Sequence, residues 1–152
     1  MSNMFKAAVG STTVLSGAFC AGLGAVRPAD RARINAARPR ALRGSVDLDA
    51  TLKKLLPTDS RWDYGVGLAE SKAERVFWIE VHPATERGAA EVEAKLEWLK
   101  AWLREHAPAL NALERTFVWI ASGAVGISPK SSIRRRLATM GLSFSGGHLR
   151  LP

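Results

Sequence analysis

Two acidic residues, Asp63 and Glu80, fall on neighbouring predicted strands and have the side chains best suited to chemistry. The segment 61–68 alternates apolar residues with Asp63 and two glycines, which is typical of a strand with one face against the core. In the next segment, 75–81, Glu80 interrupts an apolar run, and His82 follows two residues later, so these two side chains point the same way. Because the connection between the segments is short, we expect a hairpin that sets all three on one polar face lined by glycines.

A lysine joins this group from a predicted helix over 86–106. The apolar stripe of that helix recurs at i, i+3 and i+4 and comprises Ala89, Val92, Leu96, Leu99 and Leu103. At about 100° per residue, Lys95 falls inside the apolar arc and Glu91 lies at its edge. A lysine on a face that packs against a sheet needs an anion nearby, and the two acids offer one. The alternative is that Lys95 extends past Trp102 to solvent.

This set of residue types indicates phosphodiester chemistry. Paired carboxylates a few ångströms apart repel each other unless a cation neutralises them. Mg²⁺ accepts a few carboxylates together with waters and phosphate oxygens. We therefore expect Asp63 and Glu80 to bind Mg²⁺, or Mn²⁺ in its place, and Lys95 or His82 to assist the attacking water or the transition state. The predicted activity is metal-dependent phosphodiester hydrolysis.

The order and spacing of these residues resemble the PD-(D/E)XK nuclease superfamily, which has the restriction-endonuclease-like fold. The resemblance covers roughly residues 47–121. Asp63 matches the first acid of the family motif and Glu80 the second, in the run Ile-Glu-Val-His. It implies a nuclease that binds Mg²⁺ through these acids, acts on DNA and forms a homodimer in order to cut two strands.

The sequence departs from the family pattern at two positions. Trp62 stands where the motif has proline, and His82 stands where it has lysine. Some members supply the lysine from the next helix, and Lys95 is placed for that role. Other interpretations stay open: Asp63 as a turn acid, His82 as the end of an edge strand, and the chain as an inactive relative. Two further hypotheses are a non-catalytic nucleic-acid-binding module and a protein–protein adaptor or accessory subunit.

The predicted elements favour an α/β (α+β) fold, a small mixed β-sheet flanked by helices. They are a helix from 45 or 47 to 56, strands at 61–68 and 75–81, a helix over 86–106, a strand at 116–121, a helix over 130–140 and a final strand at 148–151. We expect one compact domain over 45–152. We expect residues 1–44 to form a flexible or loosely packed segment that ends in an Arg-rich arm.

The charge balance indicates polyanions as partners. Among 152 residues, 22 are Lys or Arg and 14 are Asp or Glu, which gives a net charge of +8. An excess of this size favours nucleic acid, and we favour DNA, although a merely basic protein is the alternative. The residues expected to contact the phosphate backbone are Arg38, Arg40, Arg43, Lys130, Arg134, Arg135 and Arg136. The competing interpretation is a solvated linker and a solvated helix face.

The amino-terminal stretch bears on location. No charged residue occurs between Lys6 and Arg27, so one interpretation of residues 1–26 is a signal peptide. Several glycines and hydroxyl side chains weaken this stretch as a membrane span, and no stable membrane insertion is expected. The single cysteine, Cys20, cannot form an internal disulfide. We expect a cytoplasmic protein.

Overall fold

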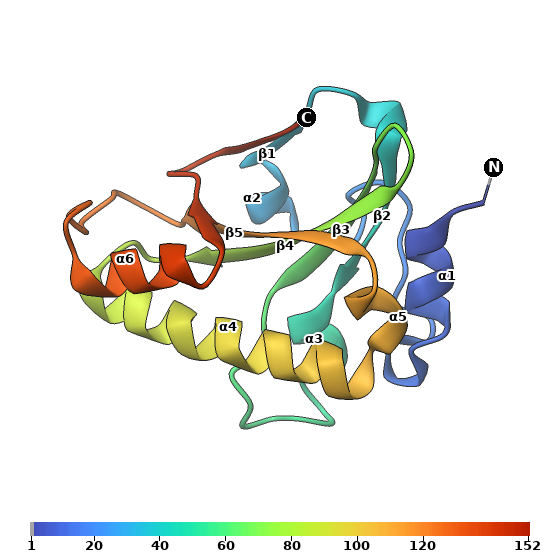
Figure 1. Cartoon of the computed structure of the whole chain (residues 1–152), viewed down its shortest axis with the longest axis horizontal. Helices are drawn as coiled ribbons and strands as arrows, with labels where there is room; N and C mark the ends of the chain where they lie inside the picture. The colour runs from blue at the N-terminus through green and yellow to red at the C-terminus, as the bar shows by residue number, and fades with distance from the viewer. Residues whose placement is uncertain (1) are drawn as a thin grey trace.

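A five-stranded mixed sheet forms the centre of the protein (Figure 1). The computed structural model describes residues 2–152. The sheet has the order β2–β3–β4–β5–β6, with β2 (Leu42–Asp47), β3 (Tyr64–Ala69), β4 (Glu74–His82), β5 (Glu114–Ala121) and β6 (Leu142–Phe144). The first three strands are antiparallel, whereas β4, β5 and β6 run parallel. The predicted mixed sheet flanked by helices is confirmed.

The long helix α4 (Glu86–His106) connects the parallel strands β4 and β5, as a parallel pair requires. It begins where the Thr85 hydroxyl accepts a hydrogen bond from the Gly88 backbone N–H. Its bounds agree with the predicted helix over 86–106. Its apolar stripe is buried against the sheet, and α5 (Pro108–Asn111) follows before the chain enters β5.

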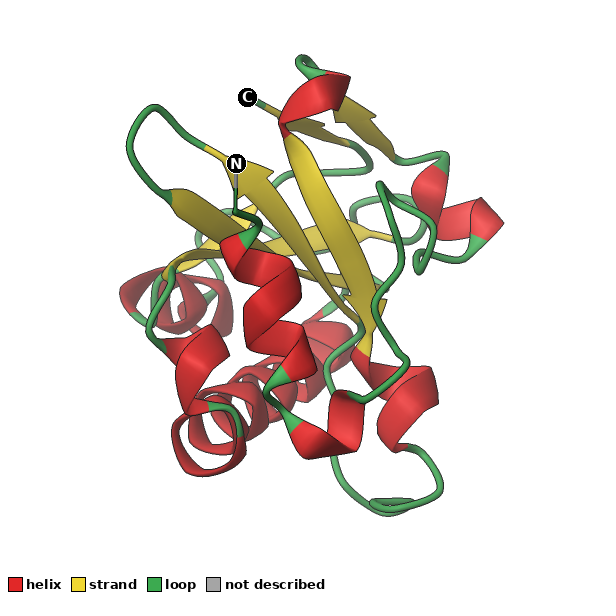
Figure 2. Cartoon of the chain, turned by 90° about the vertical axis from the view of Figure 1, so that its right-hand side faces the viewer, coloured by secondary structure: helices red, strands yellow, loops and turns green. Residues whose placement is uncertain are grey.

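Two hydrophobic cores cover the two faces of the sheet. The larger core lies between the sheet and the helices that cover one of its faces (Figure 2). Trp62, Trp78 and Trp119 are fully buried within it. The second core lies on the opposite face, under a separate parallel pair formed by β1 (Ile34–Ala36) and β7 (Leu149–Leu151). The helix side of the sheet is the side that carries Glu80, because Glu80 and Trp78 are two residues apart on β4.

The predicted polar face lined by glycines is wrong in one respect. Gly65 and Gly67 lie directly beneath aromatic rings, because a Cβ atom at Gly65 would meet the Trp78 ring at 2.5 Å and one at Gly67 would meet Phe5 at 2.5 Å. The glycines admit core aromatic side chains rather than a ligand. The polar side chains on this face near Glu80 are therefore those of Asp63, His82 and Lys95, not a tract lined by the glycines.

The prediction that residues 1–44 are loosely packed is also wrong. Helix α1 (Met4–Gly10) buries Phe5 and Val9 in the larger core, and the carboxylate of Glu74 accepts hydrogen bonds from the backbone N–H groups of Met4 and Phe5. The remaining elements of this part are the 3₁₀ turns η1 (Thr13–Leu15) and η2 (Pro39–Ala41), the short helix α2 (Pro28–Arg31) and β1. The uncharged stretch supplies core side chains, which is why it carries so little charge.

Smaller differences concern the ends of elements. The chain enters β2 at Leu42, so the compact domain includes the arm that was expected to precede it. The expected helix up to residue 56 is shortened to α3 (Leu48–Leu52), capped by the Asp47 side chain. Helix α6 (Ser132–Thr139) is close to its expected range, whereas strand β6 was not predicted. Among residues 2–152, no helix combines the length and the apolar character needed to cross a bilayer.

Candidate functional site

Glu80 is the centre of a buried polar cluster at the end of β4. Its side chain is 0% exposed, yet both carboxylate oxygens have partners. Oε1 accepts a hydrogen bond from the Asp63 backbone N–H at 3.1 Å. Oε2 accepts one from Lys95 Nζ and lies 3.3 Å from Nδ1 of His82. Every polar contact of this fully buried carboxylate is thus supplied by the protein, through one backbone N–H and two basic side chains.

Asp63 lies beside Glu80 and is held by the neighbouring strand. Its residue is 6% exposed, and Oδ2 accepts a hydrogen bond from the Val81 backbone N–H at 2.9 Å. Each acid therefore binds the backbone next to the other acid, which fixes both carboxylates. Burial and the charge of Glu80 raise the pKa of Asp63 to about 7, although Lys95 acts in the opposite direction. At neutral pH an additional cation beside Asp63 would favour the ionised form of its carboxyl group.

Lys95 and His82 form the rim of the cluster, with side chains 20% and 17% exposed. Burial opposes the charge of Lys95, but the carboxylates of Glu80 and Asp63 outweigh it and raise its pKa. The hydrogen bond to Glu80 raises the pKa of His82, and so does Glu91, whose Oε1 lies 3.2 Å from Nε2. The structure thus brings together all four residues proposed for catalysis, and Lys95 contacts Glu80 instead of extending past Trp102.

Arg27 belongs to the same site but was not foreseen in it. Its Nη2 lies 3.9 Å from Oδ1 of Asp63, while its Nε donates to the Tyr64 hydroxyl at 2.8 Å. That hydroxyl donates in turn to Asp30 Oδ2 at 2.5 Å. The Arg27 side chain is 57% exposed and its Nη2 also lies 3.8 Å from Oδ2 of Asp30, so a guanidinium shared by two acids lies at the opening of the site. No local sequence signal connects an arginine of the arm with a strand acid 36 residues later.

Of the three arm arginines expected to bind phosphate, Arg38 and Arg40 are exposed, whereas Arg43 is half-buried. Nη2 of Arg38 lies 3.4 Å from the carbonyl oxygen of Ala69. Arg43 pairs with the buried Glu74 at 3.6 Å, and its Nη1 donates to the carbonyl of exposed Arg40. These three arginines cluster at the start of β4, whereas Glu80 lies near its end. The arm is therefore folded onto the sheet rather than mobile, and the expected contact of these arginines with a nucleic acid stays a prediction.

The basic residues of α6 lie at the same end of β4 as the acids. Arg136 forms a paired contact with Glu93 of α4, at 2.8 and 2.9 Å, and Ser131 contacts Glu86 near the start of α4. The Arg134 guanidinium lies over the Phe144 ring at 4.6 Å from its centroid. Lys130 and Arg135 are exposed. The contacts with α4 lie on the flank of that helix that carries Glu86 and Glu93, whereas Glu91 and Lys95 lie on the opposite flank, so this part of the predicted nucleic-acid surface lies across α4 from the acids.

Two carboxylates of the cluster are available to a divalent cation. Asp63 and Glu80 supply carboxylate oxygens, and Mg²⁺ commonly takes one or two carboxylates while substrate phosphates and waters complete its shell. Throughout residues 2–152 no three side chains of Asp, Glu, His or Cys gather into a cluster able to hold a metal by themselves. The pair therefore fits a cation that shares its shell with substrate, not a structural metal enclosed by protein.

Asp63→Asn is expected to stabilise the metal-free protein at alkaline pH. The unfolded chain releases this proton near pH 4 and the folded chain near pH 7, so the folded state binds more protons between these values and stability falls as pH rises. Burial is the main cause of the raised pKa of Asp63, and the charged groups that face this carboxyl are Glu80, Lys95, Asp49 and Arg27. The variant should gain roughly 3 kcal/mol in unfolding free energy above pH 7 and little near pH 4. Urea titrations with chelator test this, and parallel pH profiles would contradict it.

Comparisons with protein-family models, with curated proteins and with solved structures find no match to this chain.

Proposed function

We propose that this chain is a metal-dependent phosphodiester hydrolase that acts on nucleic acid, with DNA as the favoured substrate. The observation that carries the proposal is the convergence of Asp63, Glu80 and Lys95 at one end of the sheet. The acids hold each other's backbone, and the lysine contacts Glu80 from α4. Burying two acids and a lysine costs stability, and a structural role alone is served better by apolar residues.

The order of elements lends further support. Over residues 47–121 the chain runs through helix α3, the antiparallel strands β3 and β4, helices α4 and α5, and then β5 parallel to β4. The resemblance to PD-(D/E)XK nucleases implies a helix, a strand hairpin with the two acids, a helix and a further strand. Asp63 directly precedes β3 and Glu80 lies on β4, which agrees with that implied order.

In this proposal Asp63 and Glu80 would hold Mg²⁺ or Mn²⁺. When bound, such an ion supplies an activated water and stabilises the in-line attack on phosphorus. Lys95 is kept protonated by the two acids and provides a positive charge for the phosphate oxygens. His82 is likewise biased toward its protonated form by Glu80 and Glu91. Arg27, fixed by Tyr64, adds a guanidinium suited to a phosphate at the opening.

The surroundings favour an anionic polymer as substrate. The net charge is +8, and Lys130, Arg134 and Arg135 of the α6 region lie at the same end of the sheet as the acids. Arg136 contributes less, because Glu93 neutralises it. Phosphate contacts from such residues position a nucleic acid without reading its sequence. A homodimer would align two sites with two strands, and it remains a prediction.

A second candidate is a nucleic-acid-binding module without catalysis. The observation that favours it is the saturation of Glu80, whose two oxygens already meet the Asp63 N–H, Lys95 and His82. In such a module Lys95 would replace the metal permanently. Binding would then be sensitive to salt and independent of divalent cations.

The experiment that separates these candidates is a cleavage assay on supercoiled plasmid DNA. The purified protein should nick or linearise the plasmid with Mg²⁺ or Mn²⁺, and chelator should abolish the reaction. Plasmid that is bound at low salt but stays intact with either ion would favour the non-catalytic module. A labelled single-stranded RNA in the same buffers tests the preference for DNA.

A further inference from the structure

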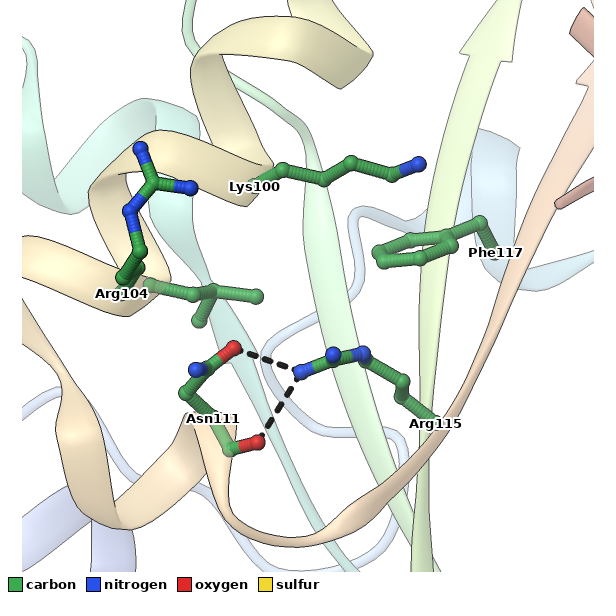
Figure 3. A pocket seen from close by; sticks show the side chains of 6 residues that line it. Lys100, Arg104, Asn111, Arg115 and Phe117 are labelled. Atoms are coloured by element: carbon green, nitrogen blue, oxygen red, sulfur yellow. Dashed lines mark hydrogen bonds between the residues drawn. The ribbon is translucent and has the colours of Figure 1, made fainter. Parts of the chain in front are cut away.

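A second polar feature lies well away from the acids, where α4 ends and β5 begins. It is a pocket of about 270 Å³ (Figure 3). Its lining comprises Lys100, Leu103, Arg104, Asn111, Arg115 and Phe117. Arg115 lies four residues before Trp119, the β5 residue that pairs with Glu80. Four strand residues span about 13 Å, so this pocket is separate from the candidate catalytic site.

The pocket contains three cationic side chains and no acidic one among its lining residues. Lys100 and Arg104 come from α4, and Arg115 comes from β5. The carboxylate nearest to Arg104 is Glu105, which is itself exposed, lies 3.7 Å away and does not line the pocket. Burial lowers the pKa of Lys100, and the positive charge of Arg115 lowers it further. These cations therefore repel one another without compensation from the pocket walls.

This arrangement differs from that of the enclosed cations elsewhere in the protein. Arg61 pairs with Asp49 at 3.1 Å, and Lys95 contacts Glu80. In the pocket, neutral acceptors take the place of carboxylates. Arg115 Nη1 donates to the Asn111 carbonyl at 2.9 Å and to its side-chain oxygen at 2.5 Å. Such contacts hold the guanidinium in one orientation without neutralising its charge.

Lys100 is positioned in a similar way. Its Nζ donates to the carbonyl oxygen of Met140 at 2.6 Å and lies 5.4 Å from the centroid of the Phe117 ring. Figure 3 shows Lys100 extending from the helix over Phe117 and Arg115 extending from the strand toward Asn111. An ammonium has three N–H donors, so two remain available beyond the Met140 contact. Two oriented cations over an apolar floor form a receptor for a compact anion that carries an organic group.

We infer that this pocket binds a terminal phosphate monoester, the dianionic group found on a free nucleotide and on the 5′ end of a nucleic-acid strand. Arg115 offers the planar fork that matches phosphate oxygens, and Lys100 adds a point charge. Phe117 and Leu103 provide an apolar surface for the attached group. The volume is at the small end for ligand pockets, which suits one nucleotide rather than a larger cofactor.

Calorimetric titration with matched probes tests this inference. The free-nucleotide arm compares AMP with adenosine, and the strand-end arm compares a tetranucleotide bearing a 5′-phosphate with its 5′-hydroxyl form. The phosphorylated member of at least one pair should bind at least about tenfold more tightly. The arm with the larger ratio identifies the source of the phosphate. Equal affinity within both pairs, or no binding by any probe, would overturn the inference.

Variants locate the binding. Arg115→Gln should lower affinity for the preferred phosphorylated probe at least about tenfold, and because Arg115 is exposed the fold should survive. Lys100→Met should also lower the affinity for this probe, which tests the second cation independently. Arg87→Gln removes one exposed cation from the same protein and should leave affinity within about twofold. Equal losses in Arg115→Gln and Arg87→Gln would show only a general charge effect and would contradict the pocket. Chelator is present throughout, so the outcome does not depend on the catalytic proposal.

Discussion

Glu80→Gln is expected to lower the rate of Mg²⁺-dependent plasmid cleavage by at least about a thousandfold, because it removes a charge that the proposed metal site needs. The change keeps the size of the side chain, and its amide oxygen can still accept the hydrogen bond from the Asp63 backbone N–H. Lys95 is partly exposed and can turn its ammonium toward water. Gel quantification of nicked and linear plasmid over time measures the effect.

Glu91→Gln is the matched control for this prediction. Glu91 also contacts His82, at 3.2 Å, but its side chain is largely exposed and it binds neither Lys95 nor the Asp63 backbone. Cleavage by this variant should stay within about threefold of the unmodified protein, as expected for a solvent-screened contact. If both variants cleave at similar rates, Glu80 has no catalytic role.

Lys95→Met is expected to lower the free energy of unfolding by about 3 kcal/mol at pH 7, because it leaves the fully buried Glu80 with only His82 as a charged partner. Methionine retains the length and the apolar part of the side chain, so packing against the core changes little. Urea denaturation followed by tryptophan fluorescence provides the measurement. The buried tryptophans of the core make this signal sensitive to global unfolding.

The double variant Lys95→Met with Glu80→Gln separates charge from packing. Once Glu80 is neutral, the loss caused by Lys95→Met should shrink by about 2 kcal/mol, which is the coupling energy expected of a buried pair. Lys130→Met, an exposed lysine, should change stability by no more than about 0.5 kcal/mol. Additive effects of the two substitutions would mean that Lys95 does not compensate the charge of Glu80.

The candidate site was predictable where short-range periodicity governs side-chain direction. Strand alternation placed Glu80 and His82 on one side of β4, and the helical wheel placed Lys95 on the face of α4 that meets the sheet. The hairpin then brought Asp63 beside Glu80. Each inference needed only neighbouring elements, and an α4 that packs back onto its own strand leaves little freedom for these contacts.

Features set by long-range packing could not be predicted. Arg27 reaches Asp63 only because the arm folds over the second face of the sheet, and the tyrosine that holds it, Tyr64, was assigned to an apolar face. The alternation predicted Trp62 on the same face of the strand as Tyr64. Trp62 instead lies in the core on the opposite face, because the regular strand begins only at residue 64. The uncharged amino-terminal stretch has no strong periodicity, so its burial of Phe5 depended on a partner surface across the sheet.

Binding of Mn²⁺, titrated by calorimetry into the unmodified protein and into Asp63→Asn and Glu80→Gln, tests the central claim most directly. The proposed site predicts saturable binding by the unmodified protein and loss of that binding in both variants, with Glu91→Gln unchanged. Thermal unfolding of each variant verifies that the fold is retained. Equal Mn²⁺ binding by all four proteins, or none by the unmodified one in the presence of DNA, would contradict a metal site formed by Asp63 and Glu80.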